Sequence, residues 1–101
     1  MESSTEKLLP IGTVVKVKSL KKPVMIYGRF QIQKRTENVY DYLAVPYPEG
    51  NISEEFNVFF NRNLIEEVLY LGFQSPQEDG MNEKVEKDLK EYREKEENTI
   101  D

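Results

Sequence analysis

Six carboxylates in the body of the chain are the main candidates for acid–base chemistry, because the sequence contains no histidine and no cysteine. Those two residue types supply the commonest general bases, nucleophiles and metal ligands. The carboxylates are Asp41, Glu49, Glu54, Glu55, Glu66 and Glu67. We predict from this inventory that the protein is not an enzyme, has no catalytic residue, and binds no metal or cofactor.

Glu66 and Glu67 match the residue types of the paired carboxylates in glycosidases. Adjacent side chains point apart, however, and the N-terminus of a helix favours negative charge in any case. We therefore interpret the pair as capping or solvated residues. The glutamates near the C-terminus lack the alternating Asp/Asn pattern and central glycine of a calcium-binding loop, and we interpret them as a solvated helix face.

Tyrosines recur through the predicted strands, and Tyr27, Tyr42 and Tyr47 are candidates for an aromatic sheet face. Small barrels with exposed aromatic residues bind Pro-rich peptides or stacked bases. The alternative is that these rings fill the core. Because the chain has no basic patch, base stacking is the weaker binding interpretation. We predict that the three tyrosines contact a partner protein, and the core interpretation stays open beside it.

The sequence pattern of residues 75–101 predicts a helix. Ser75, Pro76 and Glu78 have the types and spacing of an N-cap, N1 and N3, although Gly80 predicts an interruption soon afterwards. Apolar residues then recur at steps of three or four positions on one narrow stripe: Met81, Val85, Leu89 and Tyr92. We expect the helix to pack weakly on the body or to await a partner, with this stripe as the partner contact.

Alternation of apolar and polar residues predicts five strands, at about residues 13–18, 24–33, 39–45, 56–61 and 68–71. Gly28 is the predicted corner at which the longest strand bends. Asn63 and Glu66 have the spacing of a helix cap, which predicts a single helical turn before the last strand. Phe56–Phe73 is the densest apolar run, and we expect the rest of the chain to pack on it.

These elements predict a mainly β (α+β) fold. It is a small bent five-stranded antiparallel sheet or SH3-like barrel, with a one-turn helix before the last strand and an acidic C-terminal helix. An open sheet covered by the C-terminal helix is the alternative. We divide the chain into a flexible N-terminus at 1–7, a small β domain at 8–74 and a charged helical tail at 75–101.

The net charge of −5 lies in the tail. Residues 1–74 hold nine acidic and nine basic side chains, whereas residues 75–101 hold ten acidic and five basic ones. This acidic balance disfavours binding to nucleic-acid phosphates. The sequence also lacks an apolar run long enough to span a membrane and a signal-peptide core at its start, so we predict a cytoplasmic location.

Four segments carry a family resemblance through their order and spacing. They are LLPIGTVV at 8–15, KPVMIYG at 22–28, YDY at 40–42 with PYPEG at 46–50, and FFN at 59–61 with IEEV at 65–68 and GF at 72–73. Over about Leu8 to Phe73, the chain resembles the small Firmicute proteins grouped as domain of unknown function family 4176.

The resemblance implies a cytoplasmic accessory protein encoded near type VII secretion effectors, especially toxins with a long helical Leu-x-Gly domain. It implies a chaperone, adaptor or targeting role. The implied partner is a secreted effector or toxin, bound at that protein's N-terminal helical domain. The resemblance implies no catalytic residue. The alternative is an immunity protein that neutralises a cognate toxin, where an acidic tail could mimic a nucleic acid. An uncharacterised enzyme is the third and least favoured hypothesis.

Overall fold

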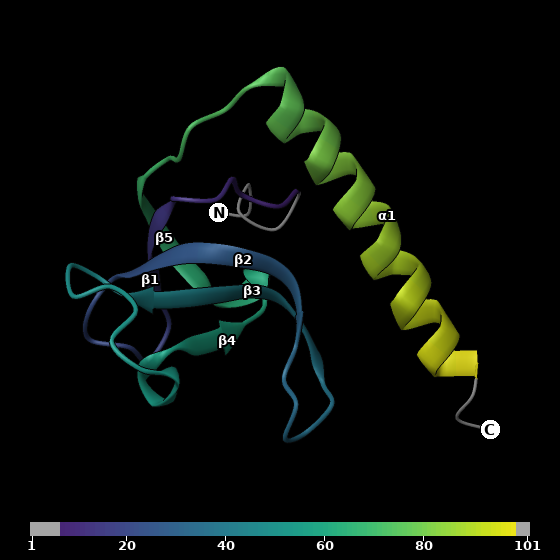
Figure 1. Ribbon diagram of the computed structural model, residues 1–101, viewed down its shortest axis with the longest axis horizontal. Helices are drawn as coiled ribbons and strands as arrows, with labels where there is room; N and C mark the ends of the chain where they lie inside the picture. Colours follow the sequence, from purple (N-terminus) through teal and green to yellow (C-terminus); the bar gives the residue numbers. More distant parts are fainter. Residues whose placement is uncertain (1–6, 99–101) are drawn as a thin grey trace.

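The computed structural model describes residues 7–98. Figure 1 shows a curled sheet with one long helix along its side. The strands are β1 (Val14–Val17), β2 (Val24–Ile32), β3 (Val39–Pro46), β4 (Val58–Phe60) and β5 (Ile65–Tyr70), and the helix is α1 (Pro76–Asn98). Two 3-10 turns, η2 (Glu54–Phe56) and η3 (Arg62–Leu64), flank β4.

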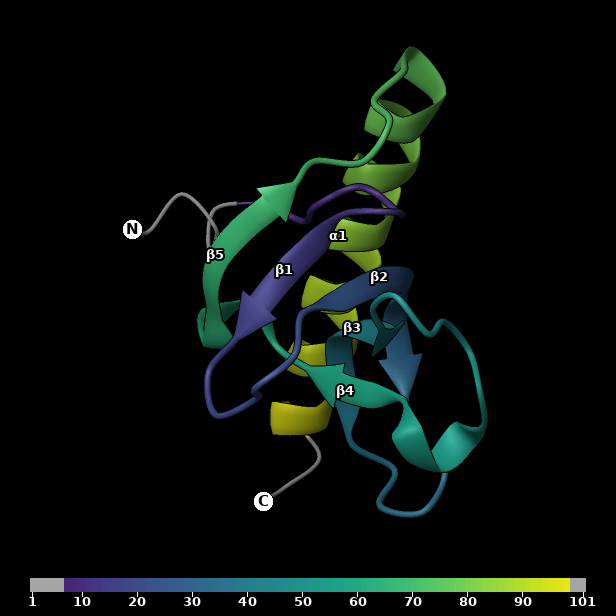
Figure 2. The ribbon, with the colours of Figure 1, turned by 90° about the vertical axis from the view of Figure 1, so that its left-hand side faces the viewer.

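The five strands form one antiparallel sheet in the order β4-β3-β2-β1-β5, which confirms the predicted sheet. The sheet is open, with β4 and β5 as its two edges, so the barrel version of the prediction is wrong and the alternative holds. Strand β4 has only three residues, too short a ladder for closure. Strand β5 instead pairs with β1 at the opposite edge of the sheet from β4 (Figure 2).

The sheet bends within β2. The pairing of β2 with β3 shifts register between Ile26 and Gly28, at the predicted corner. Two residues later Phe30 adopts a positive φ of 55°, which is uncommon for a large side chain. This irregular backbone turns Phe30 and Arg29 toward α1, since Phe30 packs on Tyr92 and Arg29 pairs with Glu78.

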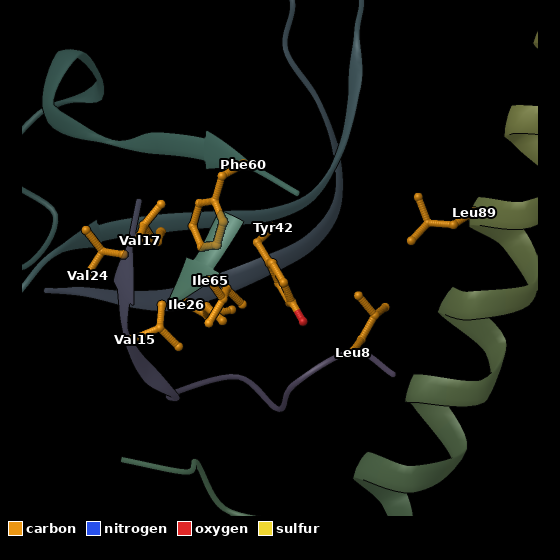
Figure 3. Packing of buried hydrophobic residues seen from close by; sticks show 10 residues of the cluster. Leu8, Val15, Val17, Val24, Ile26, Tyr42, Phe60, Ile65 and Leu89 are labelled. Carbon is orange, nitrogen blue, oxygen red and sulfur yellow. The ribbon is translucent and has the colours of Figure 1, made fainter. Parts of the chain in front are cut away.

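The core lies inside the curl, on the inward faces of β1, β2 and β3 (Figure 3). Residues buried there include Val15, Ile26, Tyr42 and Ala44, each with no exposed surface. In a strand, alternate residues point to the same face, and Val15 and Val17 meet this core while Lys16 stays in water.

The prediction that Phe56–Phe73 forms the centre of the fold is wrong. Phe60 and Ile65 reach the core, but the apolar residues from Val68 to Leu71 remain exposed, because β5 has a neighbour on one side only. The predicted helix cap is also wrong. The turn before β5 is η3, flanked by Asn61 without a side-chain cap, and Glu66 lies within β5.

Helix α1 begins as predicted, with the Glu78 N–H donating to the Ser75 hydroxyl at 3.1 Å. It then continues through Gly80, so the predicted interruption is wrong. The Leu89 side chain is 2% exposed and points toward the core, where Leu8 meets it (Figure 3). Of the helices in residues 7–98, none is long and apolar enough to cross a membrane.

We predict that Leu89→Ala destabilises the protein by about 3 kcal/mol, because it removes a buried side chain at the junction of helix and sheet. The control is Met81→Ala on the same helix, where 49% of the side chain is exposed and the expected change is below about 0.5 kcal/mol. Urea unfolding followed by circular dichroism measures both. Equal midpoints for the two variants would show that α1 does not hold the core closed.

Candidate functional site

A buried carboxylate organises the contact between α1 and the sheet. The Asp41 side chain, on β3, is 3% exposed. Its Oδ2 accepts hydrogen bonds from the backbone N–H of Arg62 at 2.9 Å and from Arg62 Nε at 3.0 Å. Its Oδ1 accepts from Arg93 Nη1 of α1 at 3.1 Å. Strand β3, η3 and the last turns of α1 therefore converge on one carboxylate.

Arg62 extends this network to the middle of α1. Its Nη1 and Nη2 donate to the two carboxylate oxygens of Glu86 at 3.0 and 3.1 Å. A second bidentate pair joins Arg29 of β2 to Glu78 in the first turn of α1, at 2.6 and 3.2 Å. Fork-shaped guanidinium–carboxylate pairs fix orientation as well as distance. The helix is thus held in one register along its length.

The segment from Leu8 to Gly12 runs between the sheet and α1 (Figure 1). Glu86 Oε2 accepts from the Leu8 N–H at 2.9 Å, and Asn82 Nδ2 donates to the Leu8 carbonyl at 2.6 Å. On the sheet side, the Leu9 N–H donates to the Tyr42 hydroxyl at 2.9 Å. The segment is therefore hydrogen-bonded to both layers.

Three groups of this junction have shifted pKa values. Burial alone would raise the pKa of Asp41, but hydrogen bonds and charge from Arg62, with the charge of Arg93, outweigh it and lower that pKa below its ordinary value. Burial raises the pKa of Tyr42 to about 12, so its phenol stays protonated. Burial disfavours the charged form of Arg62, yet its hydrogen bonds to Asp41 and Glu86 raise its pKa overall.

This junction is built to hold helix and sheet together, since its charged groups are engaged with one another. An open hollow of about 310 Å³ beside it is lined by Arg62, Glu86, Leu89, Lys90, Arg93 and Glu94. Of the six candidate carboxylates, Asp41 is the buried one and the other five are exposed. Among the described side chains, no group of three or more possible metal ligands comes together.

The predicted partner-binding residues divide into exposed and buried ones. Tyr27, Tyr47 and Met81 are between 40% and 49% exposed and available to a partner. Val85 and Tyr92 are half-buried against the sheet, where Tyr92 meets Phe30 with ring centroids 5.7 Å apart. Tyr42 and Leu89 lie in the core and cannot reach a partner while α1 is docked.

An exposed apolar surface along β5 was missed by sequence reasoning. We call it the β5 surface, and it consists of Val68, Leu69, Tyr70, Leu71, Phe73 and the neighbouring Ile11. Tyr70 is 65% exposed and Phe73 82% exposed. Residues 68–71 are apolar without alternation and so place apolar side chains on both faces of a strand, but such a run does not tell whether those faces are covered.

Gly72 joins the two parts of this surface. Its N–H donates to the hydroxyl of the buried Thr13 at 2.9 Å. A Cβ at this position would collide with the carbonyl oxygen of Ile11, so only glycine fits. The close approach brings the backbone of Ile11 against the chain at Gly72, between Leu71 and Phe73.

The fold and its surfaces define a small open-sheet protein closed by a C-terminal helix, with apolar side chains exposed along one edge. The chain belongs to a known family: the family model described as domain of unknown function (DUF4176) matches residues 8–81. This match spans all five strands and the first turn of α1. Comparison with curated proteins and with solved structures gave no match.

We predict that Asp41→Asn lowers the free energy of unfolding by about 3 kcal/mol at pH 7, because it removes the buried charge that Arg62 and Arg93 share and leaves Arg62 with Glu86 alone. The folded pKa of Asp41 is depressed, so its stabilisation is complete above the unfolded pKa of about 3.9 and is lost as the pH falls through the folded value. The gap between wild type and variant should therefore shrink in acid.

Urea unfolding across this pH range measures that gap. The matched control is Asp88→Asn, whose carboxylate pairs with Lys84 on the exposed side of α1. We expect it to change stability by less than about 0.5 kcal/mol at any pH. A constant gap for Asp41→Asn between neutral and acid pH would contradict the depressed pKa.

Proposed function

We propose that the protein is a non-enzymatic binding module that accompanies an exported effector protein as its chaperone or targeting factor. The β5 surface is the observation that carries this proposal. Contiguous exposed apolar patches on small proteins mark interaction sites, because leaving such side chains in water costs free energy that a partner recovers. Here most of the patch belongs to β5, the edge strand that Figure 2 shows apart from α1, and to the segment that follows it.

The nature of the partner rests on the sequence resemblance, which links the family to type VII secretion effectors and their cytoplasmic accessory proteins. We propose that the module binds the N-terminal helical domain of such an effector in the cytoplasm, before export. Tyr27, Tyr47 and Met81 supply further exposed contacts of suitable type. The proposal includes no nucleic acid, membrane insertion, metal or cofactor.

The charges of α1 favour the targeting role over the immunity alternative. An immunity protein that mimics a nucleic acid would present a run of free acidic side chains. Here Glu78 and Glu86 instead face Arg29 and Arg62 of the same chain. Within residues 76–95, the part of α1 whose side chains the structure describes, the exposed charges are balanced, with Asp79, Glu83, Glu91 and Glu94 against Lys84, Lys87, Lys90 and Lys95.

We predict that the tagged protein, co-expressed with its neighbouring effector split into two halves, co-elutes with the N-terminal half in size-exclusion chromatography. Tyr70→Lys, in the β5 surface, should reduce the recovered complex by about tenfold, since a charge replaces an aromatic ring that the bound partner would cover. Phe56→Lys is the matched control, because Phe56 is similarly exposed near the opposite sheet edge.

Co-elution with the C-terminal half of the effector alone, which carries the toxin activity, would overturn the targeting role and favour the immunity alternative. Co-elution with neither half would overturn both. Equal losses for Tyr70→Lys and Phe56→Lys would keep the partner but move its binding site away from β5.

A further inference from the structure

We propose that β5 binds an extended, β-branched and basic segment of the effector, adjoining its N-terminal helical domain, as an additional strand of the sheet. This inference rests on the proposed function and deepens it, because it names the chemistry of the segment that is recognised. Strand addition at a sheet edge obtains affinity from backbone hydrogen bonds and specificity from alternate side chains.

The two edges of the sheet differ in their capacity to accept a strand. Strand β4 offers three residues, and the turns η2 and η3 adjoin its two ends. Strand β5 offers six residues, and Figure 2 shows its outer side clear of α1. An edge strand carries a row of backbone N–H and C=O groups that a further strand can pair. Only β5 is long enough for a stable ladder.

The side chains of β5 are suited to a neighbour on that open side. Ile65 alone is buried, while Val68, Leu69 and Tyr70 are exposed although they are apolar. Strand β3, by contrast, has a paired neighbour on each side, and its Ala44 belongs to the core. An added strand would give β5 the second neighbour that its composition requires.

Charge specifies the incoming segment. Glu66 and Glu67 are exposed at one end of β5, and neither has an ion-pair partner among the described side chains. On its occupied side β5 already pairs with Val14–Val17, with Lys16 in register with Glu67. Strand β1 therefore displays the chemistry that β5 accepts: β-branched apolar residues with lysine opposite glutamate. A segment of the same kind suits the open side.

The same features disfavour a second copy of this chain as the occupant. Two copies of β5 would bring four glutamates into one interface without any basic residue of β5 to offset them. Like charges on facing strands are destabilising, so charge separates a basic partner segment from a second copy.

The test uses the full chain, labelled with ¹⁵N, and a synthetic peptide with the sequence of residues 13–18, TVVKVK. We expect amide chemical-shift changes confined to residues 65–71 and their β1 neighbours. The same peptide with both lysines replaced by glutamate should bind about tenfold more weakly, because attraction to Glu66 and Glu67 is replaced by repulsion. Equal affinity for the two peptides, shifts elsewhere, or no shifts at about millimolar peptide would overturn the proposal.

A charge reversal in the protein makes the test specific. The double variant Glu66→Lys with Glu67→Lys should prefer the glutamate peptide instead. Its matched control is Glu54→Lys with Glu55→Lys, a second pair of adjacent exposed glutamates, located in η2. The control should keep the preference of the wild type. Sedimentation of the free protein as a dimer that Leu69→Lys dissociates would assign the edge to a second copy and overturn the partner segment.

Failure of this inference is separable from failure of the proposed function. If the effector half co-elutes equally with wild type and with the Glu66/Glu67 variant, the function stands and the strand site is overturned. If the peptide binds as described but no effector half co-elutes, the strand site stands and the effector assignment is overturned.

Discussion

A sheet that does not close on itself leaves one side of its core open to water, and the rest of this structure follows from that constraint. The five strands curl around Val15, Ile26 and Tyr42 but provide no strand to complete the circle. Leu8 and Leu89, from opposite ends of the chain, cover the opening instead. The hydrophobic effect favours this closure without fixing its geometry, because burial of apolar surface is non-directional.

The geometry is fixed by charge. Asp41 accepts from η3 and from the end of α1, and Arg62 carries the network on to Glu86. A buried ion pair contributes little net stability against an apolar replacement, yet an unpaired buried charge is costly. Any shift of α1 along the sheet would separate these groups. The network therefore determines the position of the helix on the sheet, while burial of Leu89 supplies the driving force for its docking.

Local sequence patterns predicted which elements form, but not which elements lie next to one another in the fold. The strands, the bend at Gly28 and the Ser75 cap are each determined by residues close together in the sequence, and all are present. The edge position of β5 depends on which strand pairs with which, and periodicity carries no such information. An apolar run reads the same whether it lies in a core or along an open edge, so exposure at Tyr70 was missed. Asp41 was noticed as a carboxylate, but its arginine partners lie far away in sequence.

The Leu8 segment links the beginning of the chain to its end. Leu8 is bonded to Asn82 and Glu86, which are 74 and 78 positions further along. A ribosome releases the chain from its N-terminus, so the strands can pair before the residues that cover their core have been made. During that interval Tyr42 and its neighbours face solvent. Completion of this fold must therefore wait until residues 82–89 have left the ribosome, and the nascent sheet is exposed to chaperones and proteases until then.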